Sequence, residues 1–496
     1  LSMGILVSHR GGRLTFRSPM LRDAFARAAP DALRPRIHEA AFRYYQDAAA
    51  ALPEERRLPM LAAHASRSGR PDAAAAAWLR LADGKRHRHA YVEAEGLYSR
   101  TLAALPEGDH AGRLPALRGR GLMRYRIGRI EEAVADLAAA GEAAEGLGDS
   151  ATRLECLLDE ATALDWMSDY ARSATRVAQA EVLAPSAPGP LLAARLAFAG
   201  GRTLFRAGRW PEAAEALRGA ARLAEALGDE GYETLVVSLL VLAVVLPNLG
   251  PAEAAAEVLE HVEALCRERG DRLHLAAVYN NRRNVWVARR DVAAAVDDLE
   301  RTIRIGRDLG MSGNEYFGEF NIAELLYQAG ELEEARRHAR RAVEIESSHP
   351  ETAPVPHGLL LEARLLARLG DAAQARDRLA AVRSAVERAR DRGWHGGELG
   401  PSEEVLVSMV DLATRGAGPD EWDDLVERSR RFSVEQEPIE VAEMRGLSAL
   451  RSGRIEEARA ALAGALELAR SIPNLMEERL RGALREAGTG VGPRVP

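Results

Sequence analysis

The phrase Gly128-Arg-Ile-Glu-Glu-Ala133 returns along the chain at a nearly fixed interval. Clear copies and one degenerate copy begin, in chain order, at Gly208, Gly250, Arg290, Gly330, Gly370 and Gly453. From Gly208 the steps are 42 residues, then 80 across the degenerate copy, then 40. Each phrase ends one apolar helical pattern and opens the next. A hairpin of two such helices cannot bury an apolar face alone and must stack, so the period predicts an all-α solenoid.

The composition is that of an ordinary soluble protein, with 47% apolar residues, 28% charged residues and a formal net charge of −7. The length of 496 residues does not indicate the number of domains, because a solenoid grows by adding repeats. Arginine carries nearly all the positive charge, and Lys85 is the single lysine. Because the total is acidic, we expect no nucleic-acid binding by the repeats.

The surroundings of Lys85 argue against nucleotide chemistry. A phosphate-binding loop needs Gly-x-x-x-x-Gly-Lys-Ser/Thr, but here Leu79 occupies the first glycine position and Arg86 follows the lysine. The sequence contains neither Gly-x-Ser-x-Gly nor His-Glu-x-x-His. His87 and His89 form only a weak metal pair, and surface histidines are the commoner interpretation. We therefore predict that the chain is not an enzyme and holds no metal or cofactor.

The cysteines and the apolar runs indicate a cytoplasmic protein. Cys156 and Cys266 lie far apart and match no metal spacing, so both are expected to be core thiols in a reducing compartment. The sequence has no basic segment followed by an apolar one at its start, so we expect no secretory signal. The longest apolar run, Leu235 to Leu246, is interrupted by Ser238 and is too short to span a bilayer.

Five regions are expected along the chain. Residues 1–45 contain a short β-hairpin around residues 10–12, followed by linking helices. A two-stranded hairpin is marginal alone, so we expect it to be the tail of a domain that begins before Leu1. Irregular first repeats follow over 46–110, regular repeats over 111–390, irregular and capping repeats over 391–485, and a disordered tail over 486–496.

The hairpin pattern resembles the tetratricopeptide repeat. Asn321-Ile-Ala-Glu-Leu-Leu326 has the alternation of large and small residues of its first helix. Ala335, Ala339 and Ala342 match the small positions of its second helix. The period near 40 is similar to the long version found in signal-transduction ATPases of the STAND class. This resemblance implies a right-handed superhelical solenoid.

Two further stretches carry the STAND resemblance. Leu14–Asp23 and Ile37–Ala41 look like the winged-helix end and first sensor helices that follow the ATPase module in those proteins. Leu157–Trp166 resembles the sensor repeats of bacterial members that carry a kinase or a LuxR-type effector. The resemblance covers the whole chain but includes no catalytic motif. It implies a sensor and autoregulatory arm of an attached ATPase and effector, which is a transcription factor or a kinase.

The strongest local anomaly is Tyr279-Asn-Asn-Arg-Arg-Asn-Val-Trp286. In repeat register, Arg282 and Arg283 occupy packing positions that Ile322 and Ala323 fill one repeat later. A buried guanidinium must be paired. One interpretation is therefore an internal ion pair with Asp297, Asp298 or Glu319. The other is a site for an anion or a peptide carboxylate, with amide side chains for backbone contacts.

The same register predicts which side chains line the concave face of the solenoid. Beside the arginines lies an apolar wall, because the helix around residues 239–246 is apolar on all sides. An apolar wall next to an arginine-asparagine patch suits a protein, a peptide or a small amphipathic ligand. The predicted contact residues are Asn280, Asn284, Arg283, Arg282, Arg202, Phe198, Phe205, Leu240, Val244, Glu324 and Tyr327.

The sequence favours a non-catalytic sensor solenoid that binds a partner on its concave face and regulates a STAND ATPase. A free-standing tetratricopeptide scaffold without a switching role is the alternative. The two differ in whether coding sequence for an ATPase lies upstream of Leu1. An enzyme or enzyme accessory domain is disfavoured by the lack of a catalytic constellation.

Overall fold

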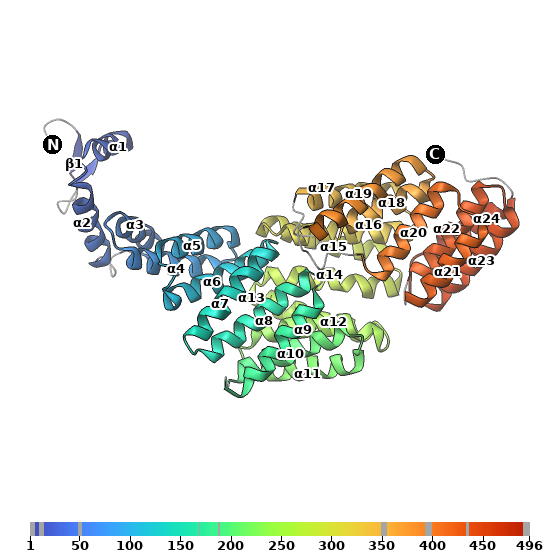
Figure 1. Ribbon diagram of the computed structural model, residues 1–496, viewed down its shortest axis with the longest axis horizontal. Coiled ribbons are helices and arrows are strands. Elements are labelled where there is room, and N and C mark those ends of the chain that lie inside the picture. The colour runs from blue at the N-terminus through green and yellow to red at the C-terminus, as the bar shows by residue number, and fades with distance from the viewer. Residues whose placement is uncertain are drawn as a thin grey trace. The chain divides into compact units, whose positions relative to one another are not determined.

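The predicted helical hairpins are present throughout the computed structural model. The structure describes residues 5–8, 14–47, 52–167, 169–186, 189–348, 355–391, 399–432 and 436–489. Within these ranges it contains 24 α-helices, two 3₁₀ turns and one two-stranded sheet (Figure 1). The chain divides into two compact units, 1–120 and 121–496. The division falls inside α6, and the finer boundaries expected from the sequence stay predictions.

The first unit begins with the expected β-hairpin. Strands β1 (Leu6–Ser8) and β2 (Leu14–Phe16) pair antiparallel, with Leu6 opposite Phe16. Five helices follow before the boundary helix: α1 (Pro19–Ala28), α2 (Arg34–Asp47), α3 (Glu54–Arg67), α4 (Pro71–Arg86), α5 (Tyr91–Ala104) and then α6 (His110–Arg126). The core of α2, α3 and α4 is built from Phe42 with small residues of the next helices. In contrast, α1 buries none of its residues.

The second unit is a succession of helical hairpins, in which consecutive helices pack side by side. Its helices are α7 (Ile130–Gly146), α8 (Ser150–Trp166), α9 (Tyr170–Leu183), α10 (Pro190–Arg206), α11 (Trp210–Glu225), α12 (Tyr232–Val245), α13 (Glu253–Arg269), α14 (Arg272–Arg289), α15 (Val292–Leu309), α16 (Ser312–Ala329), α17 (Leu332–Ser348), α18 (His357–Leu369), α19 (Ala372–Asp391), α20 (Pro401–Arg415), α21 (Pro419–Phe432), α22 (Glu437–Arg451), α23 (Ile455–Ser471) and α24 (Glu477–Thr489). The 3₁₀ turns are η2 (Ala184–Ser186) and η3 (Leu246–Asn248).

The turns repeat at half the sequence period. Residues with left-handed backbone follow one another 20 residues apart at Gly270, Arg290, Gly310 and Gly330. In each turn the next residue donates its N–H to a carbonyl five residues back, as Asp291 does to Trp286 at 2.9 Å. These bonds satisfy carbonyls that the helix end would otherwise leave free. The sequence phrase marks only the turn inside each hairpin, whereas the structure uses the same turn between hairpins.

Close contact between the two helices of a hairpin explains the small residue that precedes each inner turn. Helices α6, α10 and α22 are each the first helix of a hairpin. Seven residues before the inner turn they carry Gly121, Gly201 and Gly446, respectively. A Cβ added there would meet the Cγ of Leu137, Leu217 and Leu462 at 2.8, 2.9 and 2.7 Å, respectively. The backbone of the first helix therefore lies directly on a leucine of the second. In α14 the equivalent position is Arg283.

The C-terminal region is more ordered than expected. Helix α24 continues to Thr489, so residues 486–489 of the expected tail are helical because Leu480, Ala483 and Ala487 pack against α22 and α23. The glycine-rich stretch at 393–400 lies mostly outside the described residues, as does the proline-rich stretch at 349–354.

Replacing Gly310 by Ala is expected to destabilise the protein by about 1–2 kcal/mol, because its φ of 68° is strained for any residue with a Cβ. Gly219, in the middle of α11, is the matched control, since open space also surrounds its added Cβ and its backbone is helical. Gly219→Ala should instead stabilise by about 0.5–1 kcal/mol. Urea unfolding followed by circular dichroism compares the two variants. Equal shifts of the midpoint would contradict the turn argument.

Candidate partner-binding face

Arg282 is held inside its hairpin by two carboxylates. Its guanidinium donates to both oxygens of Asp298, at 2.6 and 2.8 Å, and to Glu263 on α13. Trp286 Nε1 donates to the same Asp298 at 2.7 Å. Burial alone would lower the pKa of Arg282, but the hydrogen bonds and charges of Asp298 and Glu263 outweigh it and raise that pKa. The arrangement matches the internal ion pair expected with Asp298, whereas Glu263 was not foreseen.

A chain of amide and guanidinium groups crosses from α12 through α14 to α16. Asn321 Nδ2 donates to Asn280 Oδ1 at 2.8 Å, and Arg283 donates to the Oδ1 atoms of Asn321 and, at 3.5 Å, Asn284. Asn280 also donates to Asn281, whose amide reaches the Leu240 carbonyl at 3.3 Å. We call this set the amide ladder: Asn280, Asn281, Arg283, Asn284 and Asn321.

An aromatic cluster lies next to the ladder. Phe317 is four residues before Asn321 on α16, so the two share a face of the helix. The Phe317 ring contacts Trp166 of α8 at 5.6 Å between centroids, and Trp166 contacts Tyr125 at 6.3 Å. The Trp166 side chain is 47% exposed. No repeat pattern brings α6, α8 and α16 together, so the sequence does not indicate a site at these three residues.

Arg202 is buried on α10, where it occupies the repeat position that Asn284 occupies on α14. Its Nη1 donates to Thr162 Oγ1 at 3.0 Å, its Nε pairs with Asp165, and it lies over the Phe198 ring at 5.3 Å. Burial lowers the pKa of Arg202, opposed by the charge of Asp165. Phe205 is covered on one side by Arg206, at 5.2 Å. Arg202, Phe198 and Phe205 therefore lie together, and Arg202 is bound to the neighbouring hairpin.

The apolar wall predicted around residues 239–246 is largely covered by neighbouring helices. Leu240 is buried in a core cluster with Val236, Leu242 and Val278, and Val244 is only partly exposed. Helix α12 is apolar on all sides because α11, α13, α10 and α14 surround it. Leu240 therefore packs inside the protein and does not offer its side chain to a ligand, although its carbonyl carries the end of the amide ladder.

Tyr327 does not lie on an open face, which corrects the prediction for this residue, whereas Glu324 is partly exposed. Tyr327 has no exposed surface, and its hydroxyl donates to Glu440 of α22 at 2.5 Å. Three arginines, Arg364, Arg368 and Arg479, lie over the Tyr327 ring at 5.1, 5.9 and 4.9 Å. Arg364 also donates to the Glu324 carboxylate at 3.1 Å. Helices α22 and α24 thus cover this part of α16 and α18.

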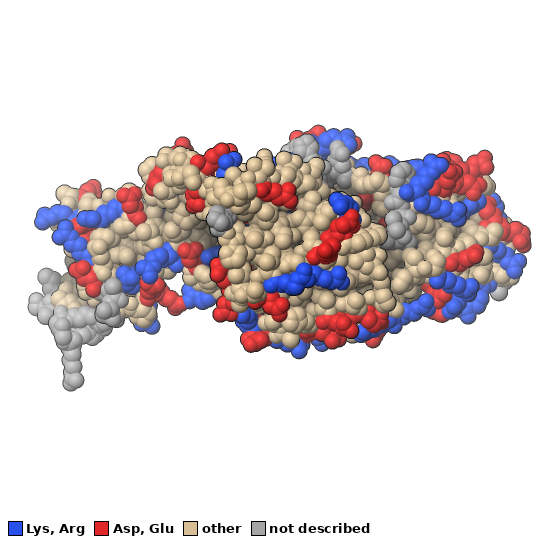
Figure 2. All heavy atoms as spheres, turned by 90° about the horizontal axis from the view of Figure 1, so that it is seen from below, with Lys and Arg blue, Asp and Glu red and all other residues tan. Residues whose placement is uncertain are grey.

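The remaining open surface carries charges of both signs. Arg126 of α6 pairs with Glu233 of α12 at 2.8 Å, and Glu233 is well exposed. Nearby cationic groups, of which Arg126 is the strongest, lower the pKa of Glu233. Basic and acidic side chains are also interspersed over the face drawn in Figure 2. Absence of nucleic-acid binding stays a prediction that this charge pattern favours.

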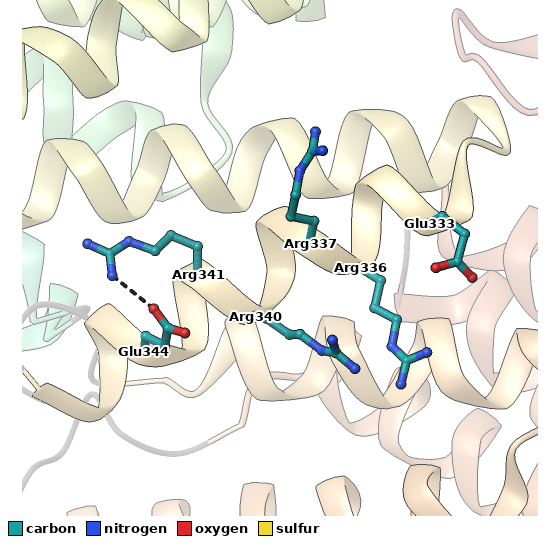
Figure 3. Close-up of a pocket in the computed structure, with 6 residues that line it drawn as sticks. All are labelled: Glu333, Arg336, Arg337, Arg340, Arg341 and Glu344. Carbon is teal, nitrogen blue, oxygen red and sulfur yellow. Dashed lines mark hydrogen bonds and ion pairs between the residues drawn. The ribbon is translucent and has the colours of Figure 1, made fainter.

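A shallow depression of about 470 Å³ lies on the outer side of α17 and is lined by arginines and glutamates. Figure 3 shows Arg336 and Arg340 pointing to one side of the helix, Arg337 to the other, and Arg341 toward Glu344. Arg341 pairs with Glu344 at 2.8 Å, and Arg340 lies 3.8 Å from Glu362. We interpret this surface as a solvated charged helix face.

His87 and His89 are each engaged by a neighbouring group. His87 bonds the Asp83 carbonyl at 2.7 Å, and His89 bonds the Tyr91 hydroxyl at 2.6 Å. Among the described residues, no group of three or more histidine, cysteine or carboxylate side chains is placed to hold a metal ion. No described helix combines the length and apolarity needed to cross a membrane. Both Cys156 and Cys266 are buried thiols.

No protein-family model and no curated protein matches the chain. Several solved helical-repeat structures are similar to it. A Rap protein complexed with Competence and Sporulation Factor is 13% identical, with a TM-score of 0.48, over 65% of this chain and 98% of that one. A STAND protein with a tetratricopeptide repeat sensor from Pyrococcus horikoshii is 12% identical, with a TM-score of 0.41, over 73% and 53%. Yeast Tom70 is 13% identical, with a TM-score of 0.30, over 84% and 95%.

These likenesses concern the fold alone. The chain is an all-α solenoid of tetratricopeptide type with a period near 40 residues, preceded by a two-stranded hairpin, as the sequence predicted. No activity, ligand or assembly is transferred from the similar structures.

Replacing Asp298 by Ala is expected to destabilise the protein by about 3–5 kcal/mol, because Arg282 and Trp286 would lose a buried acceptor. Asp297→Ala is the control, since the neighbouring Asp297 is exposed and pairs only with Arg301 within the same helix. We expect it to cost less than about 1 kcal/mol. Urea unfolding and hydrogen exchange of α14 and α15 measure both variants. An effect of Asp298→Ala as small as that of Asp297→Ala would show that the ion pair is dispensable.

Proposed function

We propose that the chain is a non-catalytic binding protein that holds a partner polypeptide on the face formed by α8, α10, α14 and α16. The observation that carries the proposal is the amide ladder. Asn280, Arg283 and Asn284 are partly exposed; Arg283 donates to Asn284 and to Asn321, and Asn321 in turn donates to Asn280.

An extended polypeptide presents alternating N–H and C=O groups, and an asparagine side chain offers both a donor and an acceptor to such a backbone. The ladder bonds are exchangeable, because each polar group that a partner engages replaces a similar bond within the ladder. Trp166 and Phe317 then provide aromatic surface for apolar side chains of the partner. An amphipathic peptide combines both requirements.

The finer proposal is that this binding regulates an attached STAND ATPase and its effector. Of the sixteen large apolar side chains exposed among the described residues, eight lie within residues 5–47. These are Val7, Leu14, Phe16, Met20, Phe25, Leu33, Ile37 and Tyr44. So dense an apolar surface on a hairpin and two helices favours coverage by a further folded module.

Regulation would work by differential affinity. A partner that binds one curvature of the repeats better shifts the population toward it, and the shift is passed to the attached module. The free-standing scaffold remains the alternative, in which the chain gathers partners without switching.

Peptides selected from a random displayed library against the whole chain should bind the variant Asn280→Ala with Asn284→Ala at least about tenfold more weakly. Each lost hydrogen bond contributes about 0.5–1.5 kcal/mol, so two account for that loss. Glu257→Ala, on an exposed position of α13, is the control and should bind like the unchanged protein. Isothermal titration gives the affinities, and circular dichroism confirms that the variant is folded. Failure to select any peptide, or peptides indifferent to the double change, would overturn the proposal.

The coding sequence upstream of Leu1 distinguishes the regulator from the scaffold. The regulator predicts a continuous reading frame that encodes an ATPase module with a phosphate-binding loop. Sequencing the genomic region gives the answer directly. A stop codon followed by an initiator close to Leu1 would favour the free-standing scaffold.

A further inference from the structure

Two histidines face each other where α2 packs on α3. The Nδ1 atoms of His38 and His64 lie 2.9 Å apart, and the ring centroids are separated by 5.1 Å. The Tyr45 ring stacks on His64 at 5.7 Å, with 11° between the planes. Both imidazoles are partly buried, so the contact is held in place from several sides.

A hydrogen bond between two Nδ1 atoms requires one nitrogen to donate and the other to accept. It therefore persists only while at least one ring keeps a bare Nδ1. When both rings are protonated, both Nδ1 atoms carry hydrogen and two positive charges face each other at close range. The contact then changes from attractive to repulsive.

The surroundings disfavour the charged rings. Burial lowers the pKa of His38, and Arg67 adds to the effect. Burial, His38 and Arg67 together lower the pKa of His64. Glu39, the carboxylate next to His38, is engaged by Arg70 at 2.7 Å through two nitrogens and by Arg43 at 2.9 Å. The other groups nearby are Tyr45, whose carbonyl accepts from Arg57 at 3.5 Å, and Arg57 itself.

The pair matters because α2 is attached by few contacts. Phe42 is its only buried residue, and Arg70 covers the Phe42 ring at 5.1 Å. The Glu39–Arg70 ion pair is exposed and contributes little. The histidine contact is thus a substantial part of what holds α2, and with it residues 5–33, against the first repeats.

We infer that His38 and His64 form a proton-sensitive clasp, which holds α2 on α3 at neutral pH and releases it on acidification. Because both pKa values are lower in the packed state than the ordinary 6.5, the unpacked state binds protons more readily. The packing is therefore fully stable above about pH 6.5 and weakens as the pH falls through the lowered values. This inference is independent of the partner-binding face.

Hydrogen exchange of the whole chain, read by mass spectrometry between about pH 7.5 and 5.5 and corrected for intrinsic rates, tests the clasp. Protection of α2 should fall with acidification by up to about tenfold per pH unit for each proton taken up. Peptides from α4 and α5 should not follow this dependence. A flat profile for α2 in the unchanged protein would overturn the inference.

His64→Gln removes the titrating ring and keeps a side chain that donates and accepts, so protection of α2 should become independent of pH. His87→Gln changes an exposed histidine of the same unit and should keep the original dependence. An unaltered dependence in His64→Gln would also contradict the clasp. If that variant opens α2 at every pH, NMR titration of the histidine rings in the unchanged protein decides. Both rings must titrate below 6.5, and values at or above it exclude the clasp.

Discussion

Contact between equivalent positions of consecutive hairpins is the constraint on which the rest of this solenoid depends. Arg202 bonds Thr162 forty residues earlier, Arg364 bonds Glu324 forty residues earlier, and Asn321 bonds Asn280 at a separation of 41. The stacking that buries the apolar faces also aligns these polar side chains, because each first helix lies beside the next in the same register. A polar residue on the inner side therefore finds its partner in the neighbouring hairpin. The amide ladder is one example.

Arginine is suited to this architecture because its planar fork binds two acceptors at fixed angles. Arg282 uses three nitrogens on two carboxylates from different helices, and Arg364 joins Glu324 to Glu440. Such buried pairs offset their own desolvation without adding much net stability. Their effect is to penalise any shift of one hairpin against another, since a shift would leave a charge buried and unpaired. The ion pairs thereby fix the alignment of neighbouring hairpins, which the contacts between small apolar side chains permit.

The spacing of the glycine phrase was sufficient to predict the hairpins, their turns and the register of the first helices, because these depend on local backbone and nearest neighbours. It also gave Asp298, sixteen residues away in the adjoining helix, as one of three acids that could pair with Arg282, and Arg282 bonds to Asp298 in the structure. The spacing did not predict contacts between hairpins that are further apart in the chain. Tyr327 meets Glu440 across 113 residues and Arg290 meets Glu477 across 187. These contacts depend on how strongly the stack of hairpins curves. The curvature is the sum of small rotations between neighbouring hairpins, and no sequence pattern predicts it.

The curvature also decides where a partner finds room. In the five hairpins from α10 to α19, the residue six positions before the inner turn is, in chain order, Arg202, Val244, Asn284, Glu324 and Arg364. Arg364 is buried and pairs both with Glu440 of the chain's own α22 and with Glu324, so the charge of Glu324 is already compensated by Arg364. At Asn284 the polar groups are completed by the ladder and stay partly exposed. Helix α22 is itself buried in two core clusters, so it is not free to leave α16 and α18. The partner proposed above would therefore bind at the ladder and Trp166 rather than beside Tyr327, which bonds to α22.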